Sequence, residues 1–522
     1  MAMELLQDPL MSWAFLASLA FVLLKLRQRR KLPLPPGPMP LPIIGNMTLM
    51  RQLTHRGLAD IAEKYGGLLH LRLGRRHAVV VSSPEYAREV LQAQDAAFSN
   101  RPATAAIAYL TYGRADMAFA HYGPFWLRAR KLAATKLFSR RRAATWLAVR
   151  DECAALVRDV ARRGRGGGEA VNLGERIFHL TRNVVFRAAF GTKDGGGGGG
   201  GEGLDEYVAV LQEFSRLMAT FSVGDFLPWL GWFDPQGINR RLRATRHALD
   251  GFIDKIIDDH LERGRNPDDP EADMVDEILA SLISETKPVV AGDDAVDGRH
   301  GSLCLTRDNI KAIILDIMFG GTDTVALSIE WAMTEMLRNP GELRRLQEEL
   351  AGVVGLGRNV SESDLGELPF LACVVKETLR MHPPIPLLLH GAAKDCAVGG
   401  YSVPGGSQVI VNVWAISRDR RAWGDPDVFR PSRFAEATGR ELNGSCFEFL
   451  PFGSGRRSCP GMALGLRALE LAVAQLAHAF DWAPPGGVEP SELDAGDVFG
   501  LSAPRATRLH AVPTPRLTCP LY

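Results

Sequence analysis

The sequence predicts a mainly α-helical fold with a small β-sheet region, preceded by a single N-terminal transmembrane helix. Most of the chain repeats apolar residues with the period of a helix, and only short segments such as 68–83 and 408–412 have the character of strands. An uncharged apolar run occupies residues 10–24. Apolar residues make up 46% and charged residues 23% of the chain, which is typical of a globular body rather than a disordered one.

The apolar run at residues 10–24 predicts an uncleaved signal anchor. It is shorter than the about 20 residues that span a bilayer, but Leu26 continues the pattern and Lys25 can extend it by snorkelling. Positive charges follow the run, whereas in a cleaved signal peptide they precede it. By the positive-inside rule the body of the protein is cytosolic. We assign residues 1–31 to a membrane anchor with a basic stop sequence.

A proline-rich hinge is predicted at residues 32–45, LPLPPGPMPLPIIG. The alternating prolines force a stiff, extended segment that cannot be helix. It is either a generic linker or a spacer that holds the body at a fixed angle to a membrane. Residues 46–522 then form the globular domain.

Within this domain, residues 68–74 and 78–83 predict a hairpin, and Pro84 begins a helix. The aromatic segment 221–233 is interpreted either as core or as a patch that dips into the membrane. The segments 164–168, 195–201 and 287–302 are glycine-rich or polar, which predicts flexible connections without chemistry.

Cysteine usage and net charge exclude several functions. The seven cysteines are odd in number and far apart, without the spacing of a disulfide framework or a zinc site. They are Cys153, Cys304, Cys373, Cys396, Cys446, Cys459 and Cys519. The formal net charge of +1 gives no argument for binding to nucleic acid.

The loop PFGSGRRSCPG at 451–461 is the strongest candidate for chemistry. Its glycines let the backbone approach a flat object closely, and Pro460 restrains the chain after Cys459. A lone thiolate presented this way, with helix-forming sequence from Met462, suits an axial ligand to haem iron. The alternative is a glycine-rich turn with one buried cysteine, and the loop alone does not decide between them.

Trp126 and Arg130 lie four residues apart in a helix that a Gly-Pro step begins, so they share a face. On their own they form either a cation–π pair or two donors to an acidic cofactor edge, such as haem propionates.

A long helix is predicted between the N-cap Thr306 and the stop at Asn339-Pro340. The adjacent Gly320 and Gly321 weaken it by about 1 kcal/mol each relative to alanine. Close passage of a flat cofactor would explain them, with the following Asp-Thr pair at 323–324 opening the hydrogen-bond ladder. The alternative is a kinked core helix whose threonine bonds back to the preceding turn.

Glu377 and Arg380 are spaced to pair on one helix face, in apolar surroundings that favour a partly buried network. The arginines of FRPSRF at 429–434 are placed to complete that network.

Five motifs in fixed order resemble the cytochrome P-450 haem-thiolate monooxygenases. They are WxxxR at 126–130, GGxDT at 320–324, ExxR at 377–380, FxPxRF at 429–434 and FGxGRRxCPG at 452–461. The resemblance covers the body from the proline stretch onward and implies the fold of that family. The anchor and hinge resemble its endoplasmic-reticulum form, which implies single-pass insertion in that membrane with a cytosolic catalytic domain.

The resemblance implies roles for individual residues. Cys459 would ligate the iron of haem b, and Asp323 and Thr324 would deliver protons during oxygen activation. The other haem-binding residues would be Phe452 and the propionate contacts Trp126, Arg130, His390 and Arg457, and the network that supports the cysteine loop would be Glu377, Arg380 and Arg433.

Stretches at 316–325, 328–332, 380–390 and 498–507 more narrowly resemble the plant ferulate (coniferaldehyde) 5-hydroxylases of lignin biosynthesis. Gly391 and Asp323 depart from that pattern, in which Glu is expected at the first and frequent at the second. The resemblance implies hydroxylation of a guaiacyl phenylpropanoid: ferulate, coniferaldehyde or coniferyl alcohol. Expected pocket residues are Phe319, Thr324, Leu387, Leu388, Leu389 and Phe499.

The chain contains no dinucleotide or flavin fingerprint, so electrons are expected from NADPH through a separate NADPH–cytochrome P-450 reductase in the same membrane. Dioxygen would be the second substrate. The alternatives are another plant monooxygenase of the family such as a flavonoid 3'-hydroxylase, a haem-thiolate isomerase, a gas-binding protein, or a membrane-anchored scaffold without a cofactor.

Overall fold

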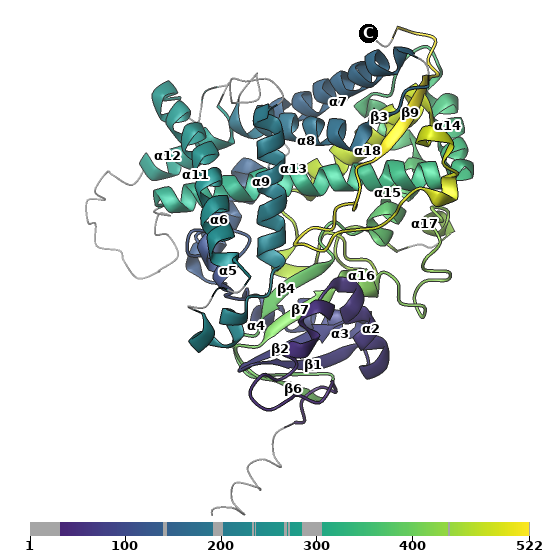
Figure 1. Ribbon diagram of the computed structural model, residues 1–522. Coiled ribbons are helices and arrows are strands. Elements are labelled where there is room, and N and C mark those ends of the chain that lie inside the picture. Colours follow the sequence, from purple (N-terminus) through teal and green to yellow (C-terminus); the bar gives the residue numbers. More distant parts are fainter. Residues whose placement is uncertain are drawn as a thin grey trace, which may run out of the picture.

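A block of helices stands on a smaller sheet region in the computed structural model of the protein (Figure 1). The structure describes residues 32–520 except 139–142, 167, 192–201, 232–233, 235, 266–268, 270–271, 284–304 and 437–438. The mainly helical fold with small sheets is confirmed. The predicted anchor at 1–31 and the glycine-rich or polar segments at 195–201 and 287–302 lie outside the described residues.

Seventeen α-helices are assigned in the described part of the chain. They are α2 (His55–Tyr65), α3 (Pro84–Arg88), α4 (Asp95–Phe98), α5 (Ala105–Leu110), α6 (Pro124–Leu132), α7 (Ala143–Arg163), α8 (Leu173–Phe190), α9 (Glu202–Ala219), α10 (Val223–Phe226), α11 (Ile238–Arg263), α12 (Met274–Ile283), α13 (Arg307–Arg338), α14 (Pro340–Val354), α15 (Pro369–Met381), α16 (Val413–Ile416), α17 (Arg433–Glu436) and α18 (Met462–Ala479).

Short 3-10 and π segments join these helices. They are η2 (Met47–Gln52), η3 (Glu89–Ala93), η4 (Ala133–Leu137), η5 (Gly164–Gly166), η6 (Pro228–Leu230), η7 (Glu362–Glu367), η8 (Gly455–Arg457), η9 (Pro485–Gly487) and η10 (Pro490–Glu492). The helix predicted from Pro84 therefore continues beyond α3 as the π turn η3.

The strands form three small sheets. The largest has the order β1-β2-β7-β4, with β2 and β7 parallel and the other pairs antiparallel. The predicted hairpin at 68–83 and the strand at 408–412 are both in this sheet. The strands are β1 (Leu68–Leu73), β2 (Arg76–Val81), β3 (Val171–Asn172), β4 (Leu387–Gly391), β5 (Cys396–Val398), β6 (Tyr401–Val403), β7 (Gln408–Asn412), β8 (Phe480–Ala483) and β9 (His510–Pro515).

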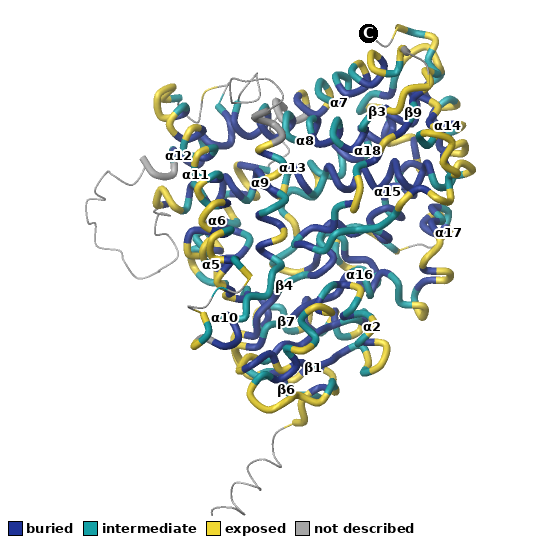
Figure 2. Tube along the Cα trace, in the orientation of Figure 1, coloured by how far each residue is buried: buried dark blue, intermediate teal, exposed yellow. Residues whose placement is uncertain are grey.

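Helix α13 runs through the middle of the helical block, where α8, α15 and α18 pack against it and burial is deepest (Figure 2). Its start is the predicted one, because Thr306 and Asn309 form a reciprocal capping box. The helix stays continuous through its two glycines. Among the described residues it alone is long and apolar enough to cross a membrane, but 72% of its most apolar window is buried inside the protein.

The proline-rich segment has neither helix nor strand from residue 32 to residue 40, which agrees with the prediction that it cannot be helix, and it lies against the sheet region. The backbone N–H of His70 donates to the carbonyl of Pro36 at 2.9 Å, and that of Ser402 donates to Pro33 at 2.7 Å. A Cβ on Gly37 would lie 2.0 Å from the His70 carbonyl oxygen, so only glycine fits at this crossing. The segment is therefore docked rather than free.

The aromatic segment after α9 is partly core and partly exposed, and its contact with a membrane stays a prediction. Phe226 and Leu227 are buried in the core beside the β1–β2 turn, whereas the side chain of Trp229 is exposed. Residues 232–233 of this segment lie outside the described part.

Candidate functional site

The cysteine loop is a tight turn that delivers Cys459 to the start of α18. The Cys459 N–H donates to the Phe452 carbonyl at 2.9 Å, and Gly453 and Gly455 adopt positive φ angles of 70° and 66°. Cys459 keeps an accessible surface, although protein atoms surround it closely enough for burial to raise the pKa of its thiol. The cysteine is thus enclosed but reachable.

Arg130 lies beside this loop. Its Nη2 donates to the carbonyl of Ser458 at 2.6 Å, and its positive charge opposes the effect of burial on the pKa of the Cys459 thiol. Trp126, one turn earlier on α6, is buried and donates its ring N–H to the Met117 carbonyl at 3.0 Å. The two residues share a region of the structure, as their spacing predicts.

Four cationic or potentially cationic side chains gather near the loop: Arg101, Arg130, His390 and Arg457. Burial lowers the pKa of each, and repulsion by neighbouring arginines lowers the pKa of Arg101, His390 and Arg457 further. The pKa of Arg457 falls to about 9 and that of His390 to about 3. Such a cluster calls for an anion that the chain itself does not fully supply.

The nearby acidic groups do not balance this cluster. Burial raises the pKa of both Asp116 and Asp316, that of Asp316 to about 7, so their negative charge is weakened. Asp316 is already engaged, because one of its oxygens accepts from the N–H groups of Met117 and Ala118 at 2.8 and 3.2 Å. A cofactor with carboxylates at its edge would neutralise the positive charge that Asp116 and Asp316 leave uncompensated.

Arg101 is the residue of this cluster that sequence reasoning missed. Its Nε donates to the Ala118 carbonyl at 2.9 Å, and its Nη1 donates to the Leu389 carbonyl. It is brought to the site by an isolated bridge between Asn100 and Gly391. The sequence offers only a single Arg-Pro step at this point, and no spacing pattern marks it.

One face of α13 is open midway along the helix, between segments that are mostly buried. Gly320 is exposed, and Gly321, Thr324 and Val325 are partly exposed on the same face. A Cβ on Gly320 would meet no protein atom within 4 Å, so protein packing does not explain this glycine. Near its start, α18 contacts this face, since a Cβ on Gly465 would lie 3.6 Å from Val325. A flat group between the two helices would account for the glycine.

Thr324 and Asp323 are adjacent but have different surroundings. The Thr324 hydroxyl donates to the Gly320 carbonyl at 2.7 Å, which is the bond back to the preceding turn that the sequence left as an alternative. Asp323 is buried, with one carboxylate oxygen that has no hydrogen-bond partner among the described residues. Burial raises the pKa of Asp323 from 3.8 to about 6. The pair therefore combines a hydroxyl on the open face with a carboxyl that can hold a proton near neutral pH.

The predicted Glu377 network is present and buried. Arg380 binds both oxygens of Glu377 at 2.8 and 2.9 Å, and Arg433 donates to the same carboxylate at 3.0 Å. The N–H of Arg430 adds a bond at 2.8 Å, whereas its side chain does not complete the network. The buried network links α15 to α17. That it also supports the cysteine loop stays a prediction.

An apolar pocket is lined by three of the expected substrate residues, Leu387, Leu389 and Phe499, together with Ile107, Met218 and Phe221. Leu388 lies on the other face of β4, because successive side chains alternate in a strand, and it approaches Gly453 of the cysteine loop. Phe319 packs against Phe214 with ring centroids 5.1 Å apart and does not line this pocket.

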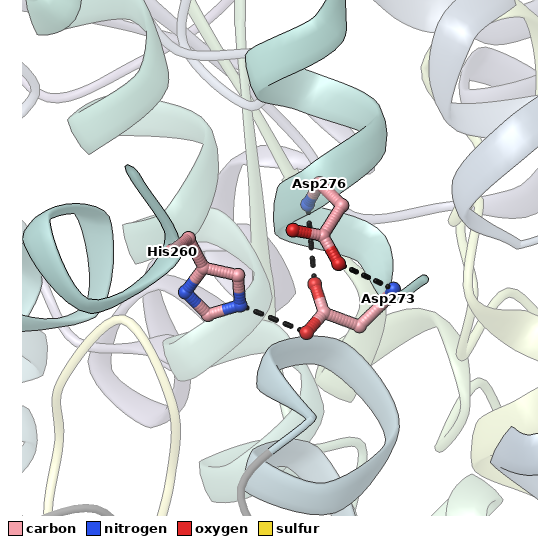
Figure 3. Close-up of side chains that lie close together, drawn as sticks. All are labelled: His260, Asp273 and Asp276. Atoms are coloured by element: carbon pink, nitrogen blue, oxygen red, sulfur yellow. Dashed lines mark hydrogen bonds and ion pairs between the residues drawn. The ribbon is translucent and has the colours of Figure 1, made fainter. Parts of the chain in front are cut away.

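A separate cluster of His260, Asp273 and Asp276 has the composition of a metal site but the geometry of a helix cap (Figure 3). The ring of His260 bonds to Asp273 at 2.8 Å and, through its other nitrogen, to the Ile256 carbonyl at 2.6 Å. Asp273 accepts from the N–H groups of Val275 and Asp276 at 2.8 and 3.1 Å. These ligand atoms are occupied, so we interpret the cluster as the clasp that begins α12 against α11.

Taken together, the enclosed thiol of Cys459, the cationic cluster and the glycine-lined face of α13 fit a haem, whose iron the Cys459 thiolate would bind and whose propionates the cluster would bind. The fold and the site thus define a haem-thiolate protein.

Comparison with known proteins agrees with this class. The sequence model of the cytochrome P450 family matches residues 35–509, and the chain belongs to this family. It is 56% identical to Cytochrome P450 84A1 of Arabidopsis thaliana over 99% of this chain and 98% of the relative. It is 38% identical to Flavonoid 3'-monooxygenase of the same plant over 92% of this chain and 91% of the relative.

Among solved structures, a zebrafish cytochrome P450 with abiraterone superposes with a TM-score of 0.72 at 26% identity, covering 88% of this chain and 99% of that one. Family membership and these neighbours make the protein a cytochrome P450 monooxygenase, and they imply a haem-thiolate iron, a redox partner and a small-molecule substrate.

Proposed function

We propose that the protein hydroxylates the aromatic ring of guaiacyl phenylpropanoids at the 5-position, beside the phenol, as a step toward syringyl lignin. One atom of dioxygen enters the ring, the other leaves as water, and NADPH supplies the two electrons through a separate reductase. One observation supports this substrate class: the stretches that resemble ferulate 5-hydroxylases line the apolar pocket. The stretches 380–390 and 498–507, which resemble ferulate 5-hydroxylases, contribute Leu387, Leu389, Phe499, Gly500 and Leu501 to the apolar pocket.

The chain's own residues have defined tasks in this proposal. Cys459 would ligate the haem iron, and Arg101, Arg130, His390 and Arg457 would bind its propionates, with Trp126 packed beside Arg457. When bound, the haem supplies the activation of dioxygen. Thr324 on the open face of α13 and the buried Asp323 beside it hold and transfer protons. The apolar pocket excludes water and orients the ring.

We also propose that the protein is anchored in the endoplasmic-reticulum membrane by residues 1–31, with the described body in the cytosol. Exposed apolar side chains of the docked proline-rich segment, at Met39 and Ile43, support a membrane-facing side, as does exposed Trp229. A membrane-bound NADPH–cytochrome P-450 reductase is the corresponding electron donor.

The test is a competition assay in microsomes that contain the full-length protein and a plant reductase. Ferulate, coniferaldehyde and coniferyl alcohol are offered together, and a flavonoid with an unsubstituted 3'-position is offered separately. We expect 5-hydroxylated guaiacyl products that depend on NADPH. Hydroxylation of the flavonoid alone would overturn the substrate assignment in favour of a flavonoid 3'-hydroxylase, and turnover without NADPH would favour an isomerase.

A further inference from the structure

Two separate stretches of chain form walls of the apolar pocket. Strand β4 contributes Leu387 and Leu389, and the second stretch contributes residues 499–501. β4 is five residues long, and residues 498–504 form neither helix nor strand. The separation of these two walls therefore depends on the contacts that hold each of them to the rest of the fold.

The backbone of Ala503 links the two walls. Its N–H donates to the carbonyl of Pro384 at 3.0 Å, and its carbonyl accepts from the ring N–H of Trp331 on α13 at 3.2 Å. Pro384 lies three residues before β4 begins, and Ala503 lies two residues after Leu501. One residue thus ties the start of one wall to the end of the other, and Trp331 holds that residue against α13.

Trp331 also supports the β4 wall directly. Its ring stacks on the ring of His382, with centroids 3.9 Å apart and planes inclined by 6°. His382 lies five residues before β4 and is itself fixed to α13, because its Nε2 is 2.8 Å from Oε1 of Glu335. Trp331 is 2% exposed and is not among the residues that line the pocket. It therefore contacts the supports of both walls from behind.

Other bonds hold the second wall independently of Trp331. The N–H of Leu501 donates to the Ser215 carbonyl of α9 at 2.9 Å, and Nη1 of Arg505 donates to the Thr334 hydroxyl of α13 at 2.6 Å. We therefore expect this wall to remain folded when the N–H of Trp331 is removed. These two bonds reach the second wall alone, whereas Trp331 supports both walls.

We propose that Trp331 is a positioning residue that determines specificity, because its bond to Ala503 and its stack on His382 together fix the separation of the two pocket walls. The inference rests on the proposed function in one respect, namely that this pocket holds the substrate. Looser walls lose contact with a narrow ligand and admit a broader one. Since Trp331 lies outside the proton-transfer pair on α13, its loss should act on binding rather than on chemistry.

The first experiment compares two ligands of different width on the full-length holoprotein. The dissociation constants of coniferaldehyde and of naringenin, a broader flavonoid, are measured from the shift of the haem Soret band on binding. Trp331→Phe removes the N–H and keeps an aromatic ring beside His382. We expect it to shift the ratio of the two dissociation constants by about fivefold in favour of the broader ligand, the size of one lost hydrogen bond. An unchanged ratio would overturn the proposal.

Trp482→Phe is the matched control. Trp482 is also buried, and its ring N–H donates to the Leu476 carbonyl at 2.9 Å, but it belongs to β8 and does not line the pocket. This variant should leave the ratio at the wild-type value. An equal shift in Trp482→Phe would attribute the effect to general loosening and overturn the proposal. If Trp331→Phe does not fold, an unchanged ratio in Trp331→Tyr would overturn it instead.

The second experiment needs no substrate. Hydrogen exchange followed by mass spectrometry should show faster exchange in Trp331→Phe for peptides that cover 384–391 and for peptides that cover 498–505, with neither changed in Trp482→Phe. Acceleration confined to one of the two peptides would refute joint support of the walls. Failure of the wild type to hydroxylate any guaiacyl substrate would refute the proposed function alone, because the exchange result does not depend on it.

Steady-state kinetics separate positioning from catalysis. In Trp331→Phe the KM for coniferaldehyde should rise about fivefold while kcat changes by less than about twofold. A fall in kcat with an unchanged KM would place the effect of Trp331 on the chemical step and overturn the proposal.

Discussion

The guanidinium of Arg380 grips the carboxylate of Glu377 at two points, 2.8 and 2.9 Å, with both side chains fully buried. The same carboxylate receives Arg433, and Arg380 also donates to the carbonyls of Ser417 and Pro426 at 2.8 Å. Glu377 supplies the only negative charge among these three side chains, and backbone carbonyls accept the remaining guanidinium hydrogen bonds. Removal of one partner therefore leaves a buried charge without compensation.

Glu377→Gln should lower the free energy of unfolding by about 3–5 kcal/mol, because it leaves two buried arginines unpaired. Chemical denaturation followed by circular dichroism measures this loss. Arg163→Ala, which breaks an exposed pair with Asp159, is the control and should cost less than about 1 kcal/mol. Equal effects of the two substitutions would show that the buried network does not hold the fold.

Cys459→Ala should abolish the reduced carbon-monoxide difference signal of thiolate-ligated haem, because residues 451–461 contain no other thiol. Cys396→Ala removes a half-buried thiol on β5 and should retain the signal. Persistence of the signal without Cys459 would refute the assignment of the ligand.

Thr324→Ala should uncouple NADPH oxidation from product formation, because the hydroxyl on the open face of α13 is lost. Product formation should fall by about 100-fold, the lower end of what a positioned proton-transfer group contributes, while NADPH oxidation continues. Thr135→Ala removes a hydroxyl with the same bond to the carbonyl four residues earlier and should stay coupled. Tight coupling in Thr324→Ala would remove this residue from proton delivery.

The raised pKa of Asp323 predicts a pH-dependent stability. The folded protein binds this proton more tightly than the unfolded chain, so the stabilisation is fully present below pH about 4 and is lost as pH rises through about 6. The difference of about two units corresponds to about 3 kcal/mol. The unfolding temperature of Asp323→Asn should therefore rise relative to that of the wild type as the pH increases from 4 to 7. A constant difference between the two unfolding temperatures across that range would contradict the raised pKa.

The His260 cluster should behave as a cap rather than as a metal site. Asp273→Ala should lower stability by about 1–2 kcal/mol through loss of the α12 cap, and Asp273→Asn should cost less because the amide oxygen still accepts. Neither chelator treatment nor added Zn²⁺ should shift the unfolding temperature of the wild type. A rise in that temperature with Zn²⁺, lost in His260→Gln, would reverse this interpretation.

Local sequence rules were sufficient to predict features that depend only on residues close together in the sequence. Thr306 could be identified as a cap, Pro124 as a helix start, and Trp126 with Arg130 as neighbours on one face, because each follows from spacing along a single helix. The alternation of a strand would also have separated Leu388 from Leu387 and Leu389, had it been applied to β4.

Long-range contacts could not be predicted in this way. Arg101 reaches the cysteine loop through a bridge to Gly391, and Ser502 meets Ser215 from 287 residues away. Nothing in the local pattern of either segment marks these partners. The burial that shifts the pKa of Asp316 and Asp323 likewise depends on the assembled fold rather than on neighbouring residues.

The segment 498–509 has a consequence for how this protein can diverge. At one end Phe499 lines the pocket, in the middle Ser502 forms a hydrogen bond with Ser215 of α9, and at the other end Arg508 and Leu509 bind Glu330. An insertion or deletion that reshaped the pocket here would move all three contacts together. Selection for a new substrate is therefore expected to proceed by single side-chain exchanges at the pocket end, while the length of the segment is retained.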